Sequence, residues 1–221
     1  MASINTQATT IGVATGAYGI SFGALSVAAG FSWVQTMGLS LLMFTGASQF
    51  AAVAIVATGG AGIAAVLTSW LLGIRNGLYA MSLSARLQPR GWRLPFAAQL
   101  TIDESTAMAI SHDDGESTAN RQEFREAFWA TGVAVFALWN LGTLIGALGA
   151  AAVGDPADWG LDAAAPAALL ALLWPRLTDR TARWTAAGAV LVAVVCIPLL
   201  PPGLPVLASA LVALVIGLRR S

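Results

Sequence analysis

Residues 43–50 read Met-Phe-Thr-Gly-Ala-Ser-Gln-Phe (MFTGASQF) and lie inside an uncharged apolar run at 33–57. A glycine and three hydrogen-bonding side chains stand where a plain membrane helix would carry Leu or Val. Glycine destabilises a helix interior, and an opened helix exposes N–H and C=O groups that can bind a polar ligand. The stretch therefore predicts a broken helix, with candidate binding residues Thr45, Gly46, Ala47, Ser48 and Gln49. The alternative is an unbroken helix in which Ser48 and Gln49 bond to neighbouring helices.

The composition around this stretch indicates an all-α, polytopic membrane protein. Hydrophobic residues make up 57% of the 221 residues and charged residues only 10%, against about 25% charged in ordinary soluble domains. The mean hydropathy is +0.74. The net charge is zero and no basic tract is present, so we expect a lipid bilayer as the environment and no nucleic-acid partner.

Seven apolar runs are candidate spans, since a hydrocarbon core of ~30 Å needs ~20 residues and sometimes fewer. They are 11–30, 33–57, 61–85, 127–152, 161–175, 182–200 and 203–218. Backbone groups in lipid must bond internally, so each run predicts a helix. We expect a single transmembrane domain over residues 1–221, with about seven spanning helices.

An eighth segment, 94–111, carries Asp103 and Glu104 near its middle. Arginines cluster at 86–93, 176–183 and 219–220, and positive residues favour the cytoplasmic side. All three clusters fall on that side if 94–111 enters and returns or lies at the interface. We therefore expect a re-entrant or interfacial segment, the N-terminus outside and the C-terminus inside.

A glycine pattern occurs twice, at Gly19–Gly23 and Gly142–Gly146. With the predicted topology the two helices run in opposite directions, which is typical of an inverted repeat with halves 11–111 and 127–218. The alternative is close helix packing through small residues.

Ionisable residues within membrane helices are costly and often mark a transport pathway. Arg75 and Asn76 lie in the middle of a run, where Arg75 is expected to pair with a ligand carboxylate or with Asp103 or Glu104. One of these two carboxylates is a candidate proton carrier. A structural ion pair is the competing interpretation for Arg75.

Three further positions are weaker candidates. Trp139 and Asn140 lie mid-run and suit either a binding site or ordinary packing. Asp162 opens the run 161–175 and suits either coupling to ions or a helix N-cap.

No chemistry beyond binding is predicted. The single histidine and the single cysteine exclude the common zinc and haem sites, and no catalytic motif is present. We expect no cofactor, no metal and no enzymatic activity.

The order of motifs resembles the AzlC family from about residue 16 to 175. The motifs are FGALSVAAGFSW (22–33), FTGASQFAAVAI (44–55), IRNGLYAMSLS (74–84), LTIDE (100–104), LWNLGTLIG (138–146) and GLDAAAPAALLALL (160–173). One departure is IRNGLYAM, where relatives often have an Asn-Leu-Arg-His type pattern. A role for that histidine cannot be transferred to this chain.

The resemblance implies a proton-coupled exporter of leucine, isoleucine, valine and methionine in the bacterial inner membrane. It also implies a small membrane partner of the AzlD type. On this hypothesis the carboxylate binds near Gly46 and Ala47, and Gln49→Ala impairs export without changing protein abundance. Export of another small amphipathic metabolite and a non-transporting membrane scaffold remain the alternatives.

Overall fold

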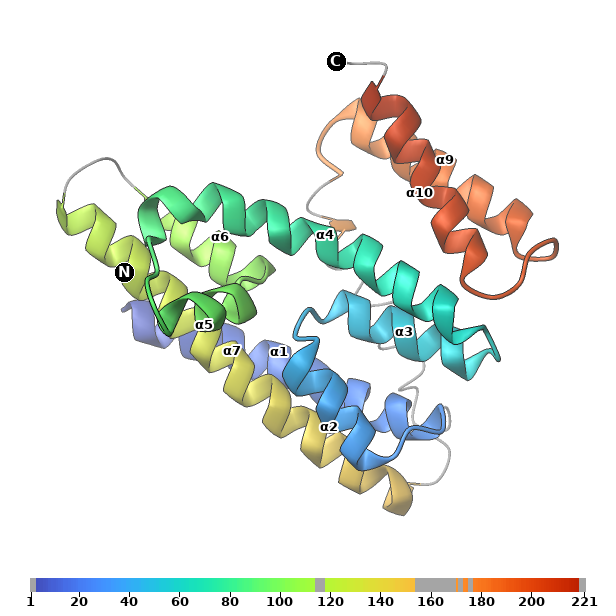
Figure 1. The fold of residues 1–221 in the computed structure, drawn as a ribbon, viewed down its shortest axis with the longest axis horizontal. Helices are drawn as coiled ribbons and strands as arrows, with labels where there is room; N and C mark the ends of the chain where they lie inside the picture. Colours follow the sequence, from blue (N-terminus) through green and yellow to red (C-terminus); the bar gives the residue numbers. More distant parts are fainter. Residues whose placement is uncertain (1–2, 114–117, 154–169, 171–172, 175–176, 219–221) are drawn as a thin grey trace.

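The computed structural model describes residues 3–113, 118–153, 170, 173–174 and 177–218 (Figure 1). All regular elements in these ranges are helices. They are α1 (Ile4–Ala28), α2 (Trp33–Leu42), α3 (Ala47–Ala57), α4 (Gly62–Leu87), α5 (Arg93–Leu100), α6 (Asp103–Ser111), α7 (Thr118–Val153), α9 (Arg180–Cys196) and α10 (Leu204–Leu218). The expected all-α class is confirmed for this part of the chain. Asp162 and most of the run 161–175 lie outside the described residues.

Two of the described helices are long and apolar enough to cross a bilayer, at Ile4–Ala28 and Asn120–Ala150. They are the central pair of the fold, α1 and α7, which lie side by side over most of their length (Figure 1). Many large apolar side chains elsewhere are exposed, including Leu191 and Val194 of α9 and Leu211 and Leu214 of α10. Apolar exposure on this scale suits a lipid environment.

The repeated glycines join α1 to α7. A side chain on Gly23 would collide with the Thr143 carbonyl, and one on Gly146 would collide with the Ile20 carbonyl. Small residues allow this close approach of two backbones. Residue numbers rise together along the contact, so α1 and α7 are parallel. The glycines are therefore a packing interface, and the expectation that these two helices run in opposite directions is wrong.

Helix α4 runs opposite to that pair. Its Arg86 carbonyl accepts a hydrogen bond of 3.0 Å from Arg125 Nε, close to where α7 begins. We call this end of the bundle, where α1 and α7 start and α4 finishes, the arginine end. Its arginines are Arg86, Arg90, Arg93, Arg121 and Arg125. The other end carries the loops 29–32 and 58–61, which hold no charged residue, and we call it the uncharged end.

The segment 33–57 begins and finishes at the uncharged end. Ser26 near the end of α1 bonds to Thr36 near the start of α2, with 2.8 Å between their hydroxyl oxygens. Helix α3 returns to the same end, because Ser48 and Ser69 exchange hydrogen bonds of 3.0 and 3.1 Å and only four residues join α3 to α4. The predicted single span over 33–57 is therefore wrong: the run turns back at its break.

The segment 93–111 follows a similar path, but it begins and finishes at the arginine end. Five residues join α4 to α5, and Asp113, just beyond α6, forms an ion pair with Arg86. Between α5 and α6 the helix is interrupted at Thr101 and Ile102. The backbone thus enters and returns, as expected for 94–111. The two broken segments reach the middle of the molecule from opposite ends.

Candidate functional site

The two breaks meet at a cavity of about 230 Å³. It is enclosed by both breaks and by one face each of α1, α4 and α7. Its lining residues are Thr15, Tyr18, Phe44, Thr45, Gly46, Ala47, Phe50, Arg75, Ile102, Asp103, Glu104, Val135 and Trp139. Pockets for drug-sized ligands are typically ~300–1,000 Å³, so this cavity suits a smaller molecule.

The first break lies between Leu42 and Ala47 and confirms the helix interruption predicted at Gly46. Gly46 has φ 60° and ψ −80°, a backbone conformation that residues with a Cβ rarely adopt. Gly46, the residue before α3, has no side chain that could cap the first N–H groups of this helix. Ala47, the first residue of α3, lines the cavity, and its N–H has no intrahelical acceptor.

Ser48 and Gln49 hold this break in shape and do not line the cavity. Gln49 Oε1 accepts a hydrogen bond from the Gly46 N–H at 3.1 Å, and its Nε2 donates to the Leu39 carbonyl at 3.0 Å. Ser48 is bonded to Ser69 of α4. The interhelical hydrogen bonds of the alternative interpretation are therefore present for Ser48, to α4, and for Gln49, to α2. Only Thr45, Gly46 and Ala47 of the five predicted binding residues line the cavity.

The second break is held in a similar way. Ser105 Oγ accepts from the Ile102 N–H at 3.1 Å and donates to the Leu100 carbonyl at 2.6 Å. Helix α6 then opens with Asp103 and Glu104, two acidic residues in its first turn. Acidic side chains are favourable at a helix N-terminus because of the helix dipole.

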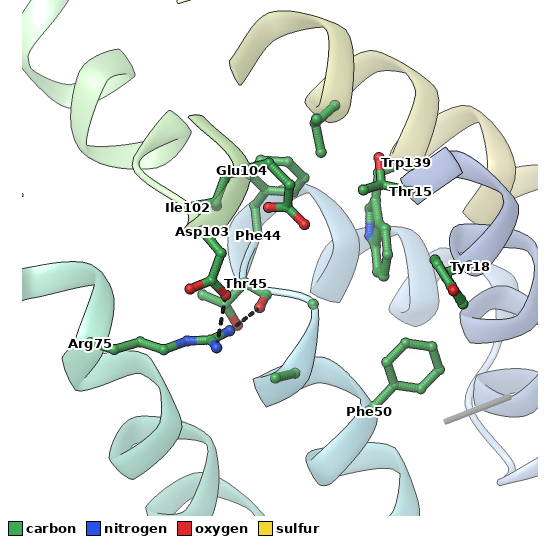
Figure 2. A pocket seen from close by; sticks show the side chains of 13 residues that line it. Thr15, Tyr18, Phe44, Thr45, Phe50, Arg75, Ile102, Asp103, Glu104 and Trp139 are labelled. Carbon is green, nitrogen blue, oxygen red and sulfur yellow. Dashed lines mark hydrogen bonds and ion pairs between the residues drawn. The ribbon is translucent and has the colours of Figure 1, made fainter. Parts of the chain in front are cut away.

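Arg75 connects the two breaks, as Figure 2 shows. Its Nη1 lies 2.8 Å from Asp103 Oδ2, and its Nη2 donates to the Thr45 carbonyl at 3.3 Å. The other Asp103 oxygen accepts from the Tyr79 hydroxyl at 2.7 Å. The pairing of Arg75 with Asp103 that the sequence suggested is therefore present. Both oxygens of Asp103 are engaged.

Glu104 differs from its neighbour. Its carboxylate points into the cavity between Phe44, Thr45 and Trp139 (Figure 2). Among the described residues this carboxylate forms no ion pair, and it accepts a hydrogen bond from its own backbone N–H. Glu104 is thus the acidic group of the cavity that is open to a ligand.

Trp139 forms the opposite wall. Its ring stacks on Phe22 at 6.0 Å and meets Phe50 edge-on at 6.2 Å between centroids. The residue is only 6% exposed, and its Nε1 has no hydrogen-bond acceptor among the described residues. A buried indole N–H normally has a partner, so this donor is available to a bound molecule.

The remaining predicted site residues lie elsewhere. Asn140 donates to the Phe136 carbonyl at 2.7 Å and does not line the cavity. Asn76 lies in a separate groove beside α4 and α5, with Ser69 and Gln99. Asp162 is outside the described residues. Among the residues that are described, no group of His, Cys, Asp and Glu is arranged to hold a metal ion.

Sequence reasoning missed Tyr18, Thr15 and Tyr79. Tyr79 follows Arg75 by four residues, a spacing that places both on one helix face, and this signal would have found it. Tyr18 and Thr15 carry no such signal, because they lie in an apolar helix without a charged neighbour.

Comparisons with known proteins agree on a membrane protein. The family model described as AzlC protein matches residues 10–153. An uncharacterized membrane protein of Helicobacter pylori strain 26695 is 26% identical over 184 residues, covering 82% of this chain and 77% of that protein. The inner membrane protein YgaZ of Escherichia coli K12 is 31% identical over 131 residues, which is 58% of this chain but only about half (51%) of YgaZ. No solved structure matches.

Proposed function

This chain belongs to the AzlC family, and from that premise we propose that it is the large subunit of a secondary exporter of branched-chain amino acids. The cargo is leucine, isoleucine and valine, with methionine as a further candidate. One observation carries the proposal: a small cavity with aromatic and aliphatic walls lies where two re-entrant segments meet, and it is lined by a carboxylate and by a buried indole N–H that has no partner among the described residues. Phe44, Phe50 and Val135 would contact the branched side chain.

The proposed topology places the arginine end in the cytoplasm, following the positive-inside rule. Helices α1, α4 and α7 then cross the inner membrane, while 33–57 enters from outside and 93–111 from the cytoplasm. Arg180 and Arg183 are consistent with this orientation, because the turn between α9 and α10 packs beside Ala64 at the uncharged end. The N-terminus is cytoplasmic in this proposal. The outward N-terminus expected from sequence required 33–57 to cross the membrane, and a segment that turns back at its break does not fit that requirement.

Paired re-entrant segments suggest how access to the cavity alternates. Each segment covers the cavity from one end of the bundle, so movement of either one opens a path to a single side of the membrane. The proton would be carried by Glu104 and not by Asp103, because Arg75 and Tyr79 occupy both Asp103 oxygens. A small AzlD-type membrane subunit would assemble with this chain, as the family resemblance implies.

The test is leucine efflux from proteoliposomes, with and without an imposed pH gradient and with and without the small subunit. We expect the gradient to accelerate efflux from vesicles containing the wild-type protein. Glu104→Gln should abolish the acceleration, whereas the matched control Glu126→Gln, on an exposed face of α7, should retain it. Absence of leucine efflux under every condition, from protein that is folded and inserted, would contradict the proposal.

A further inference from the structure

We infer that the cavity recognises both charged groups of a free α-amino acid, and that the two breaks divide this task. Trp139 Nε1 and the first N–H groups of α3 bind the carboxylate, and Glu104 binds the ammonium group. The inference rests on the proposed function and adds which groups select for a zwitterion.

The carboxylate half of the site is built from donors that lack acceptors. Trp139 is more than nine-tenths buried, lines the cavity, and its Nε1 is without a partner in the described part of the chain. A Cβ placed on Gly46 would lie 3.9 Å from Cη2 of Trp139, so the six-membered ring of the indole borders the start of α3, and Nε1 lines the same cavity. Thr45 Oγ1 is also buried without a partner beside them. A helix N-terminus with a free donor at its side is a suitable anion site.

Arg75 is a poorer candidate for the carboxylate. Its two terminal nitrogens are directed at Asp103 and at the Thr45 carbonyl. A ligand carboxylate would have to displace an ion pair that already joins the two breaks. Arg75 is therefore assigned to holding the site together.

The ammonium half is Glu104. Its carboxylate faces the same cavity from the other break, across from the Trp139 ring (Figure 2). The groups that face it from neighbouring elements are Tyr18 of α1 and Arg75 of α4, with Asp103 beside it on α6. Since Asp103 neutralises Arg75, an ammonium ion is the charge that best complements Glu104.

This arrangement predicts discrimination against molecules that keep the leucine side chain but lose one charged group. The probes are 4-methylpentanoate, which has no ammonium group, and 3-methylbutan-1-amine, which has no carboxylate. Each leaves one set of buried polar groups unpaired. Hydrogen bonds to charged groups are worth enough that each probe should bind at least about tenfold more weakly than leucine.

The experiment measures dissociation constants of leucine and both probes for the purified full-length protein, by titration calorimetry. Trp139→Phe should weaken leucine and 4-methylpentanoate at least about tenfold and leave the amine unchanged. Glu104→Gln should weaken leucine and the amine and leave 4-methylpentanoate unchanged. Trp184→Phe on exposed α9 and Glu126→Gln on α7 are matched controls that should bind all three as the wild type does.

Three outcomes are decisive. If the wild type binds either probe as tightly as leucine, the inference is overturned without any variant. If Trp139→Phe and Glu104→Gln weaken all three ligands equally, the division between the breaks is overturned while leucine binding still supports the proposed function. If the folded wild type binds none of the three, the proposed function fails together with the inference.

Discussion

The re-entrant segments 33–57 and 93–111 solve one structural problem with different residues. Both stop a helix at the cavity and start a second one there. Both place a side chain at the third position of the new helix, Gln49 or Ser105, that accepts from the N–H before the helix and donates to a carbonyl of the preceding half. The same kind of paired hydrogen bonds therefore holds the backbone in place at both breaks.

The segments differ in charge. The first break has no acidic residue and begins α3 with free N–H groups, whereas the second begins α6 with Asp103 and Glu104. The carboxylates in the first turn of α6 already offset the positive end of its helix dipole. This N-terminus therefore attracts an external anion less strongly than the N-terminus of α3. The comparison teaches that two helix breaks closed by the same kind of side-chain hydrogen bonds can present opposite charge to one cavity, which suits a ligand carrying both charges.

The largest effect is expected when the link between the two segments is removed. Arg75→Ala leaves Asp103 without its cation and Thr45 without a donor. Removing one partner of a buried pair costs about 3–5 kcal/mol, and we expect about 2–3 here since Arg75 is 25% and Asp103 12% exposed. The thermal unfolding midpoint in detergent measures this loss. Asp103→Asn added to Arg75→Ala should restore part of it, and a purely additive double variant would show that the ion pair does not couple the breaks.

The second prediction concerns the backbone of the first break, which alone requires a glycine. Gly46→Ala must hold a positive φ with a Cβ and should destabilise the protein by about 1–3 kcal/mol. Gly38→Ala is the control, because Gly38 is inside α2 and faces open space. Alanine there should be neutral or stabilising by about 0.5–1 kcal/mol. Equal unfolding midpoints for the two variants would contradict a conformational role of Gly46.

The third prediction compares the two capping side chains. Gln49→Ala and Ser105→Ala each remove two hydrogen bonds at a break and should each cost about 1–2 kcal/mol. This changes the expectation drawn from sequence, in which Gln49→Ala left abundance intact. Abundance in the membrane should now fall for both variants, while the ratio of leucine to 4-methylpentanoate affinity is retained. A selective loss of leucine affinity in Gln49→Ala would return Gln49 to the binding site.

The smallest effect is expected where the second segment meets the end of α4. Arg86 and Asp113 pair there, whereas the start of 33–57 has no charged residue. Both side chains are partly exposed, at 32% and 23%, so Arg86→Ala should cost no more than about 1 kcal/mol. Salt should reduce this difference in unfolding midpoint. A salt-independent loss would contradict a contribution from the ion pair and point instead to packing of the Arg86 side-chain stem.

The sequence was sufficient for some of these features. Glycine beside Ser and Gln in an apolar run predicted the break at Gly46, and a mid-run arginine predicted the pair with Asp103. The return of 33–57 was not predictable, because 25 apolar residues form a helix of about 37 Å that crosses a bilayer as readily as they form two halves of about 15 Å. The error in the direction of α1 followed from counting 33–57 as one crossing, because each miscounted crossing reverses the predicted direction of every helix before it. The roles of Ser48 and Gln49 depended on partners at Ser69 and Leu39, which no local pattern specifies.

The glycine contact between α1 and α7 has a mechanical consequence. Gly23, Gly142 and Gly146 each lie against a carbonyl group of the other helix. A shift of one helix along the other by less than one turn would bring the two backbones into steric collision. Large side chains, which change rotamer to absorb small displacements, are absent from these points of contact. We therefore expect α1 and α7 to move as one rigid unit, so that in the proposed transport cycle the half-helices packed against them supply the movement.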